Sequence, residues 1–142
     1  MINANTPLFD TVIYKQELDI FGYVIDRRFY VNLNNGVIVR IADKNGHDFG
    51  VLKLRPTMMR LLTYLVLNVN ANNSVVTHDD ILTNVWENYG LVATNQRMAY
   101  VINQLNTKLS ELGISEQLIK NIHGQGYGLS HIYVSILYGK SE

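Results

Sequence analysis

Six polar side chains recur at helical spacing between residues 96 and 107, and their types suit hydrogen bonding to the edges of nucleic-acid bases. Asn and Gln amides pair with N6 and N7 of adenine, and Arg pairs with O6 and N7 of guanine. Tyr and Thr bond phosphate oxygens or pack on the thymine methyl group. The candidates are Gln96, Arg97, Tyr100, Asn103, Gln104 and Thr107. The same residues also fit a solvated helix surface with no role in base contact.

A second polar group surrounds the glycine-rich run His123-Gly-Gln-Gly-Tyr-Gly128. A nucleotide-binding loop of this kind follows a strand and opens a helix, whereas no helix is predicted here and no Gly-Lys-Ser/Thr is present. The run therefore predicts the turn of a β-hairpin, with Tyr127 in the hairpin core. The polar residues available to a nucleic-acid backbone or minor groove are Lys120, Asn121, His123 and Gln125.

Other groups with chemical potential are better explained by structure. The run Thr77-His-Asp-Asp80 has the form of a helix-capping box, which accounts for its acids and hydroxyl without a metal. Met58, Met59 and Trp86 fall at positions expected of a hydrophobic core. No nucleophile or metalloprotease motif and no pair of carboxylates in an apolar pocket is present. We therefore expect no enzyme activity, metal, cofactor or small-molecule substrate.

The composition indicates one globular domain. The chain has 142 residues, of which 47% are hydrophobic and 17% charged, and it has no cysteine. No apolar run reaches the roughly 18 residues that a membrane helix needs, and the N-terminus lacks the pattern of a signal peptide. A cytoplasmic protein is expected. If the chain is a fragment of a longer protein, a membrane-spanning segment could follow Glu142.

Hydrophobic periodicity predicts where the strands lie. Residues 1–17 have no clear period and are taken as an N-terminal arm, with a short helix near 9–15 as one option. Residues 18–54 hold runs of aromatic and β-branched residues separated by Asn34-Asn-Gly36 and Asp43-Lys-Asn-Gly46, which predict three or four short antiparallel strands. The predicted strands are Phe21–Ile25, Arg28–Leu33, Val37–Ile41 and Phe49–Leu54.

The period changes after residue 54, and residues 55–113 predict three helices. Pro56 suits the first turn of the first helix, and Thr77 caps the second. The third follows Thr94 or Asn95 and ends at Gly113. Its apolar stripe is Met98, Val101, Ile102, Leu105, Leu109 and Leu112. Residues 117–138 then predict a strand, a tight turn and a returning strand, with 139–142 as a tail.

The charge balance argues against simple binding to phosphate. The formal net charge of the chain is zero. Within residues 75–131 there are three basic residues against five acidic ones, namely Arg97, Lys108 and Lys120 against Asp79, Asp80, Glu87, Glu111 and Glu116. Affinity for DNA comes largely from Lys and Arg on phosphates. Three further basic residues lie among the predicted strands, namely Arg27, Arg28 and Arg40. They could contact the DNA backbone, but the default interpretation is that they are solvated at the edges of the sheet.

From Leu54 to Leu129 the sequence resembles the effector domain of OmpR/PhoB-type transcriptional regulators, and particularly their ToxR/CadC-like branch. The opening Gly22-Tyr-Val-Ile-Asp26 is also similar to the start of that branch. The matching pieces are Leu61-Leu62, Val75-Val76-Thr77, Val85-Trp86, Leu105-x-x-Lys108-Leu109 and Ile122-x-Gly124-x-Gly126-Tyr127. Each piece is weak alone, but their order and spacing are specific.

The resemblance implies an α+β winged helix-turn-helix: an N-terminal antiparallel sheet, a three-helix core and a C-terminal hairpin wing. It implies a bacterial transcriptional regulator that binds promoter DNA, with the third helix in the major groove and the wing on the adjacent minor groove. The loop at residues 87–94 would contact RNA polymerase. Because the surface carries little positive charge, we also expect a homodimer on double-stranded DNA.

The sequence departs from the family in three places. Arg55-Pro56 stands where Ser or Thr usually precedes the first helix, and Leu105-Asn106 replaces a frequent Leu-Arg pair, with Asn103-Gln104 in place of basic residues before it. His123 occupies a position that is often basic. The alternative is therefore a winged-helix protein-interaction module with weak or lost DNA binding. The apolar run at residues 132–138 is expected either to pack on the N-terminal sheet or to form an exposed edge for dimerisation.

Overall fold

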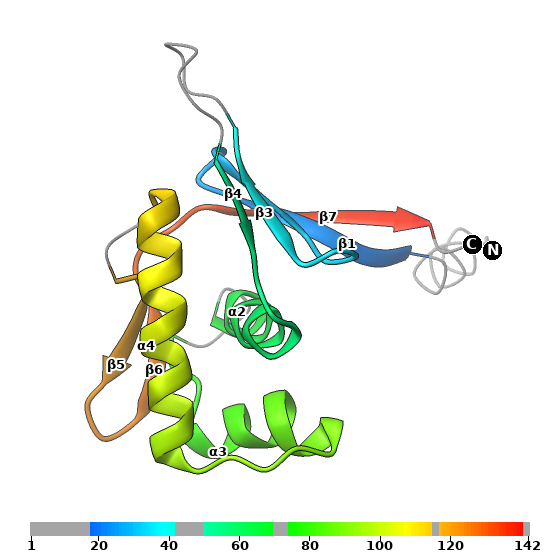
Figure 1. Ribbon diagram of the computed structural model, residues 1–142. Helices are drawn as coiled ribbons and strands as arrows, with labels where there is room; N and C mark the ends of the chain where they lie inside the picture. The colour runs from blue at the N-terminus through cyan, green and yellow to red at the C-terminus, as the bar shows by residue number, and fades with distance from the viewer. Residues whose placement is uncertain (1–17, 42–49, 70–73, 115–116, 141–142) are drawn as a thin grey trace, which may run out of the picture.

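The structure is a computed structural model that describes residues 18–41, 50–69, 74–114 and 117–140. A five-stranded sheet lies over α2, and α4 stands beside a two-stranded hairpin (Figure 1). The strands are β1 (Leu18–Ile25), β2 (Phe29–Asn32), β3 (Val37–Arg40), β4 (Val51–Lys53), β5 (Ile119–Ile122), β6 (Gly126–Leu129) and β7 (Val134–Lys140). The helices are α2 (Pro56–Val69), α3 (His78–Ile81) and α4 (Asn95–Leu112). A π-helical turn, η1 (Leu82–Trp86), and a 3-10 turn, η2 (Glu87–Tyr89), continue α3.

The predicted order of sheet, three helices and hairpin is confirmed. The predicted N-terminal arm (residues 1–17) and the turn at residues 43–46 lie outside the described residues. The second helix is longer and less regular than the single helix expected after Thr77. It passes through three helix types and ends at Gly90, whose φ of 74° stops the helical path.

The large sheet is antiparallel with the order β4-β3-β2-β1-β7. Three residues link β1 to β2, and the first two, Asp26 and Arg27, have φ of 54° and 60°. Positive φ at both central residues is typical of a type I′ turn, and the Arg28 N–H closes this one by donating to the Ile25 carbonyl at 3.0 Å. Tyr23 reaches α2, where its hydroxyl and that of Thr63 share a hydrogen bond of 3.0 Å. The buried side chains of β1, β2 and β3 are Tyr23, Ile25, Phe29, Val31 and Ile38.

The C-terminal strand corrects the prediction of one hairpin over residues 117–138. Only β5 and β6 form the hairpin, which spans 119–129 and is called the wing below. Strand β7 instead pairs with β1 at the edge of the large sheet, so that Val134 lies opposite Ile25 and Ile136 opposite Tyr23. Alternate apolar residues of β7 thus extend the buried side of the sheet, which agrees with the expectation that this run packs on the N-terminal strands.

Both long helices bury the stripes that their periodicity predicts. Helix α2 buries Met58, Met59, Leu61, Leu62, Leu65 and Val66. All six predicted stripe residues of α4 are buried as well. The Thr94 hydroxyl accepts a hydrogen bond from the Arg97 amide and caps α4, while Gly113 ends it with a φ of 106°. Thr77 caps α3 in the same way through the Asp80 amide.

The wing is fastened by its backbone to the segment that enters α3. Val76 and Tyr127 exchange two backbone hydrogen bonds of 2.8 and 2.9 Å. This approach leaves no room for a side chain at Gly126, where a Cβ would overlap the Val76 carbonyl oxygen. Gly126 also has a φ of 152°, whereas Gly124 at the wing tip has a φ of 75° and open space around it.

We predict that Gly126→Ala lowers the free energy of unfolding by about 3 kcal/mol, because the added methyl group forces two backbones apart. Gly124→Ala is the matched control, since it introduces only left-handed strain and should cost about 1 kcal/mol. Denaturant unfolding of both variants measures the two losses. Equal losses would show that Val76 does not press on the wing.

Candidate nucleic-acid interface

Helix α4 presents the six predicted residues on the side opposite its buried stripe. Gln96, Arg97, Tyr100, Asn103, Gln104 and Thr107 are all exposed, and we call them the polar face of α4. The helix has 18 residues and is capped at both ends. The structure thus brings the six together on one surface, while their role in DNA binding stays a prediction.

Hydrogen bonds along the polar face hold several of its side chains. The Gln104 amide nitrogen donates to the Tyr100 hydroxyl at 2.9 Å. The guanidinium of Arg97 lies 5.5 Å from the centre of the Tyr100 ring. The Thr107 hydroxyl donates to the Asn103 carbonyl at 3.0 Å. Gln104 therefore keeps its carbonyl oxygen and one amide hydrogen for a partner, which is the pair that adenine requires.

The wing carries the other four candidates. Lys120, Asn121, His123 and Gln125 are exposed, whereas Tyr127 is only 6% exposed and lies in the core as predicted. The backbone N–H of Gln125 donates to the Ile122 carbonyl at 2.9 Å and closes the turn. The hairpin runs alongside α4 (Figure 1), so the two predicted groups occupy neighbouring elements.

Asn106 joins these two elements and was missed as a functional candidate. The residue is buried, with 8% of its surface exposed. Its amide nitrogen donates to the Ile119 carbonyl and its amide oxygen accepts from the Ile119 N–H, each at 2.9 Å. In the sequence it stands out only as a departure from a Leu-Arg pair, and nothing there indicates that it is buried.

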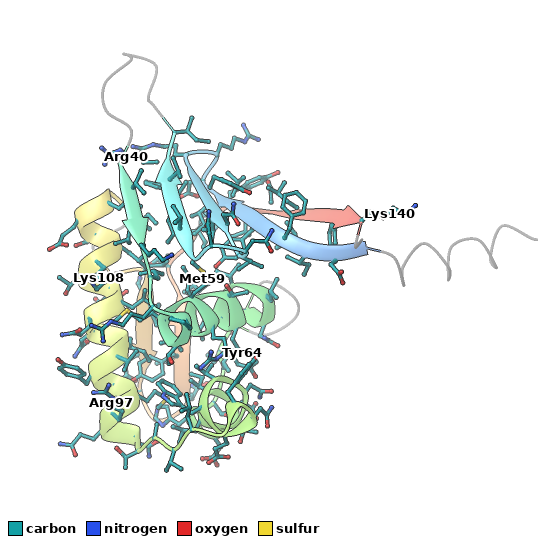
Figure 2. The ribbon with its side chains drawn as sticks, turned by 45° about the vertical axis from the view of Figure 1, so that its right-hand side comes forward. Arg40, Met59, Tyr64, Arg97, Lys108 and Lys140 are labelled. Atoms are coloured by element: carbon teal, nitrogen blue, oxygen red, sulfur yellow. The ribbon has the colours of Figure 1, made fainter. Side chains whose placement is uncertain are left out.

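One basic side chain outside the count over residues 75–131, that of Arg55, also lies near the polar face. Arg55, Arg97 and Lys108 line one groove of about 560 Å³ between the start of α2 and α4. Figure 2 shows Arg97 and Lys108 along the same helix. Arg55 belongs to a different stretch of sequence, so a count by segment separates it from the two residues that it joins in space.

Arg40 has a structural role at the end of α4 rather than the default of a solvated sheet edge. Its Nη1 donates to the Leu112 carbonyl at 2.6 Å, although the residues lie 72 positions apart. Figure 2 shows Arg40 beside the C-terminal end of α4. A cation at this end also opposes the partial negative charge of the helix C-terminus.

The loop between the second and third helices exposes apolar side chains. Tyr89, Leu91 and Val92 are 57%, 42% and 91% exposed. Arg60 of α2 supports the base of the loop, with its guanidinium 3.9 Å from the centre of the Tyr89 ring and its Nε donating to the Val85 carbonyl at 3.0 Å. The loop is therefore anchored at Tyr89 and most open at Val92.

The run Thr77-His-Asp-Asp80 opens α3. Thr77 and Asp80 form the helix cap, and the His78 ring packs 5.4 Å from the Tyr127 ring. Among the residues described, no three His, Asp or Glu side chains form a group that could hold a metal ion. No helix in the described ranges is long and apolar enough to cross a membrane.

Three tyrosines of the framework have raised pKa values. Burial raises the pKa of Tyr23, and burial also raises the pKa of Tyr127. Burial and the negative charge of Asp80 raise the pKa of Tyr64, against a hydrogen bond from Asn84. All three phenols stay neutral at physiological pH, which suits their packing roles.

A capped helix with a polar outer face, preceded by a second helix and flanked by a β-hairpin, defines a winged helix-turn-helix domain. Residues 50–129 match the family described as "Transcriptional regulatory protein, C terminal". Because the match spans more than half of the chain, the protein belongs to this family, which is the OmpR/PhoB type that its sequence resembles. The family comprises DNA-binding regulator domains and is not a class of enzymes.

One similar protein is a response regulator. The response regulator protein GraR of Staphylococcus haemolyticus (strain JCSC1435) is 31% identical over 108 residues, which are 76% of this chain and 46% of that protein. The chain therefore spans about half the length of the curated relative it matches.

Solved structures show the same fold. The DNA-binding domain of E. coli CadC has a TM-score of 0.60 at 20% identity, covering 85% of this chain and 96% of that one. The DNA-binding domain of response regulator AdeR, solved in complex with an intercistronic region, has a TM-score of 0.56 at 18% identity, covering 73% and 95%. At such identities the likeness concerns the fold alone.

We predict that Arg40→Met lowers the free energy of unfolding by about 2 kcal/mol, because the Leu112 carbonyl loses a charged donor. Arg28→Met is the control, since its exposed guanidinium lies 5.2 Å from the Phe29 ring centre and should contribute about 0.5 kcal/mol. Thermal unfolding compares the two variants. A loss for Arg40→Met no larger than that for Arg28→Met would remove the helix-end role.

Proposed function

We propose that this protein is a sequence-specific transcriptional regulator that binds promoter DNA with α4 in the major groove and the wing on the adjacent minor groove. The observation that carries the proposal is the polar face of α4, whose six side chains are all exposed while the opposite stripe is buried. The major groove is about 12 Å wide and admits one α-helix. Family membership and the AdeR domain's complex with an intercistronic region support binding to DNA, while the assignment to grooves rests on the polar face.

The polar face favours base contact over phosphate contact. Asn103 and Gln104 supply amides suited to adenine, and Arg97 supplies a guanidinium suited to guanine. Phosphate contacts are left to Arg55 and Lys108 along the groove and to Lys120 on the wing. With so few cations the affinity of one domain is low, so a homodimer on two half-sites supplies the rest.

The exposed loop gives the proposal a second partner. The loop has an apolar surface made by Tyr89, Leu91 and Val92. Exposed apolar surfaces of this kind are often covered by protein partners. RNA polymerase is the partner that fits a promoter-bound regulator acting in the cytoplasm, and the loop at residues 87–94 would be its contact.

The alternative is a protein-interaction module with weak or lost DNA binding, which the acidic balance of residues 75–131 favours. A titration with double-stranded DNA selected from a random pool, repeated at several salt concentrations, separates the two functions. Salt-dependent binding supports the regulator. A folded protein that dimerises or binds a partner, but does not bind DNA even at low salt, would support the alternative.

We predict that Asn103→Ala weakens binding to the selected DNA by about 10-fold, because one bidentate base contact is lost. The salt dependence should not change, since no phosphate contact is removed. Lys108→Ala is the contrasting variant: it should weaken all sequences alike and reduce the salt slope by about 0.9. Both changes place Ala in a helix, which preserves the fold. The same salt signature for both variants would argue against base contact by Asn103.

We also predict that Val92→Asp weakens binding of purified RNA polymerase by about fivefold or more, because a charge replaces the most exposed apolar side chain of the loop. Because Val92 also lines the groove that holds Arg55 and Lys108, the added negative charge should weaken DNA binding as well. The uncharged variant Val92→Ser separates the two effects, since its DNA affinity should stay within twofold of wild type while polymerase binding still falls. A matching change at Thr83, exposed on η1, controls for the added charge. Polymerase binding that is unaffected by Val92→Asp would remove the loop from the interface.

A further inference from the structure

We infer that Asn106 is a positioning residue that sets the wing against α4 by taking the place of a neighbouring strand at Ile119. The inference builds on the proposed function, because it concerns how the two DNA-contacting elements are held in register. The interaction itself is independent of DNA.

The backbone N–H and carbonyl of Ile119 receive their hydrogen-bond partners from Asn106. Ile119 starts β5 and is 1% exposed. The Ser130 N–H donates to the Leu118 carbonyl at 2.8 Å, so in an alternating antiparallel ladder the polar groups of Ile119 point away from β6. Both groups are buried against α4, and the two 2.9 Å bonds from Asn106 satisfy them.

The chemistry of the contact selects an amide. One side chain must offer an acceptor and a donor side by side, as a strand backbone does, and among side chains of this length Asn provides both. Ionised Asp lacks the donor, Leu lacks both groups, and Arg lacks the acceptor. Because position 106 is buried, the departure from the Leu-Arg pair changes how the wing is fastened and does not remove a cation from the DNA-facing surface.

The contact lies between the predicted DNA-contacting groups. Asn103 precedes Asn106 by less than one turn of α4, and Lys120 directly follows Ile119. The wing has its other attachment through Val76 and Tyr127 on β6. The bonds to β5 and the bonds to β6 together prevent the hairpin from rotating about either attachment. Asn106 therefore sets the position of Lys120 relative to Asn103.

The first test is amide hydrogen exchange without DNA. In Asn106→Leu, we expect the amides of β5 and β6 to exchange about tenfold faster, while those of the α4 core remain protected. Asn68→Leu is the matched control, since the Asn68 amide donates to the Tyr64 carbonyl at 2.7 Å. Wing exchange that is unchanged, or that rises equally with exchange of the α4 core, would overturn the inference.

A second variant tests the hydrogen bonds specifically and covers the case in which Asn106→Leu does not fold. In Asn106→Asp, the ionised carboxylate can accept from the Ile119 N–H but cannot donate to its carbonyl. The neutral acid can do both. Burial raises the pKa of the introduced carboxyl, so wing protection should be low at neutral pH and recover as the pH falls below that pKa. The same low protection at both pH values would contradict the strand-like role.

A double-mutant cycle then connects the contact to DNA. Lys120→Ala should weaken binding to the selected DNA by about fivefold in the wild type and have no effect in the Asn106→Asp background at neutral pH. Asn103→Ala should retain its effect in both backgrounds. A full Lys120→Ala effect in the variant would overturn the inference. If the wild type binds no DNA, the proposed function fails, and hydrogen exchange still decides the role of Asn106.

Discussion

Close backbone contact between β6 and the segment entering α3 is the constraint on which the arrangement of the helices and the wing depends. Val76 and Tyr127 pair as in a sheet, and the approach is so close that glycine is required beside it. A Cβ on Gly128 would stand 2.6 Å from the Ser74 carbonyl oxygen, so the tightness extends along the strand. The wing is therefore part of the helical core, and its angle follows from where α3 begins.

The low charge of the domain is consistent with this rigid design. A surface that relies on attraction to phosphate tolerates some relative movement of its elements, because Coulomb forces act over several ångströms. Contacts by amides need donor and acceptor placed within hydrogen-bond geometry. The polar face is rich in amides, and the Tyr100–Gln104 bond restricts one of them further. Firm attachment of the wing thus matters more here than on a surface rich in arginine.

How much the sequence predicts depends on whether the signal is local. The stripe of α4 and the caps Thr94 and Thr77 follow from residues within a few turns of each other, and each prediction is confirmed. Strand β7 could not be assigned in the same way, because its partner β1 lies over 100 residues away and its alternation fits any sheet. Asn106 shows the same limit, since helical periodicity places it between the stripe and the polar face.

A count of charges along the sequence meets the same limit. The count over residues 75–131 includes Asp79 and Asp80, which stand at the start of α3 and favour its positive end. The same count omits Arg55, which shares a groove with Arg97. Electrostatic potential belongs to a surface, and a stretch of sequence represents that surface only when a single element forms it.

The large sheet is the support to which α4 and the wing are tied. Arg40 of β3 bonds the last turn of α4, and β7 returns the chain from the wing into the sheet. Just before β7, the backbone N–H of Asp26 donates to the Tyr133 carbonyl at 2.7 Å. The Asp26 carboxylate accepts from the Tyr133 N–H at 2.8 Å. These bonds hold a turn whose two residues, Asp26 and Arg27, adopt left-handed conformations that cost energy outside glycine. The turn thus receives the chain as it leaves the wing, which ties the far end of the hairpin to the same sheet that holds the end of α4.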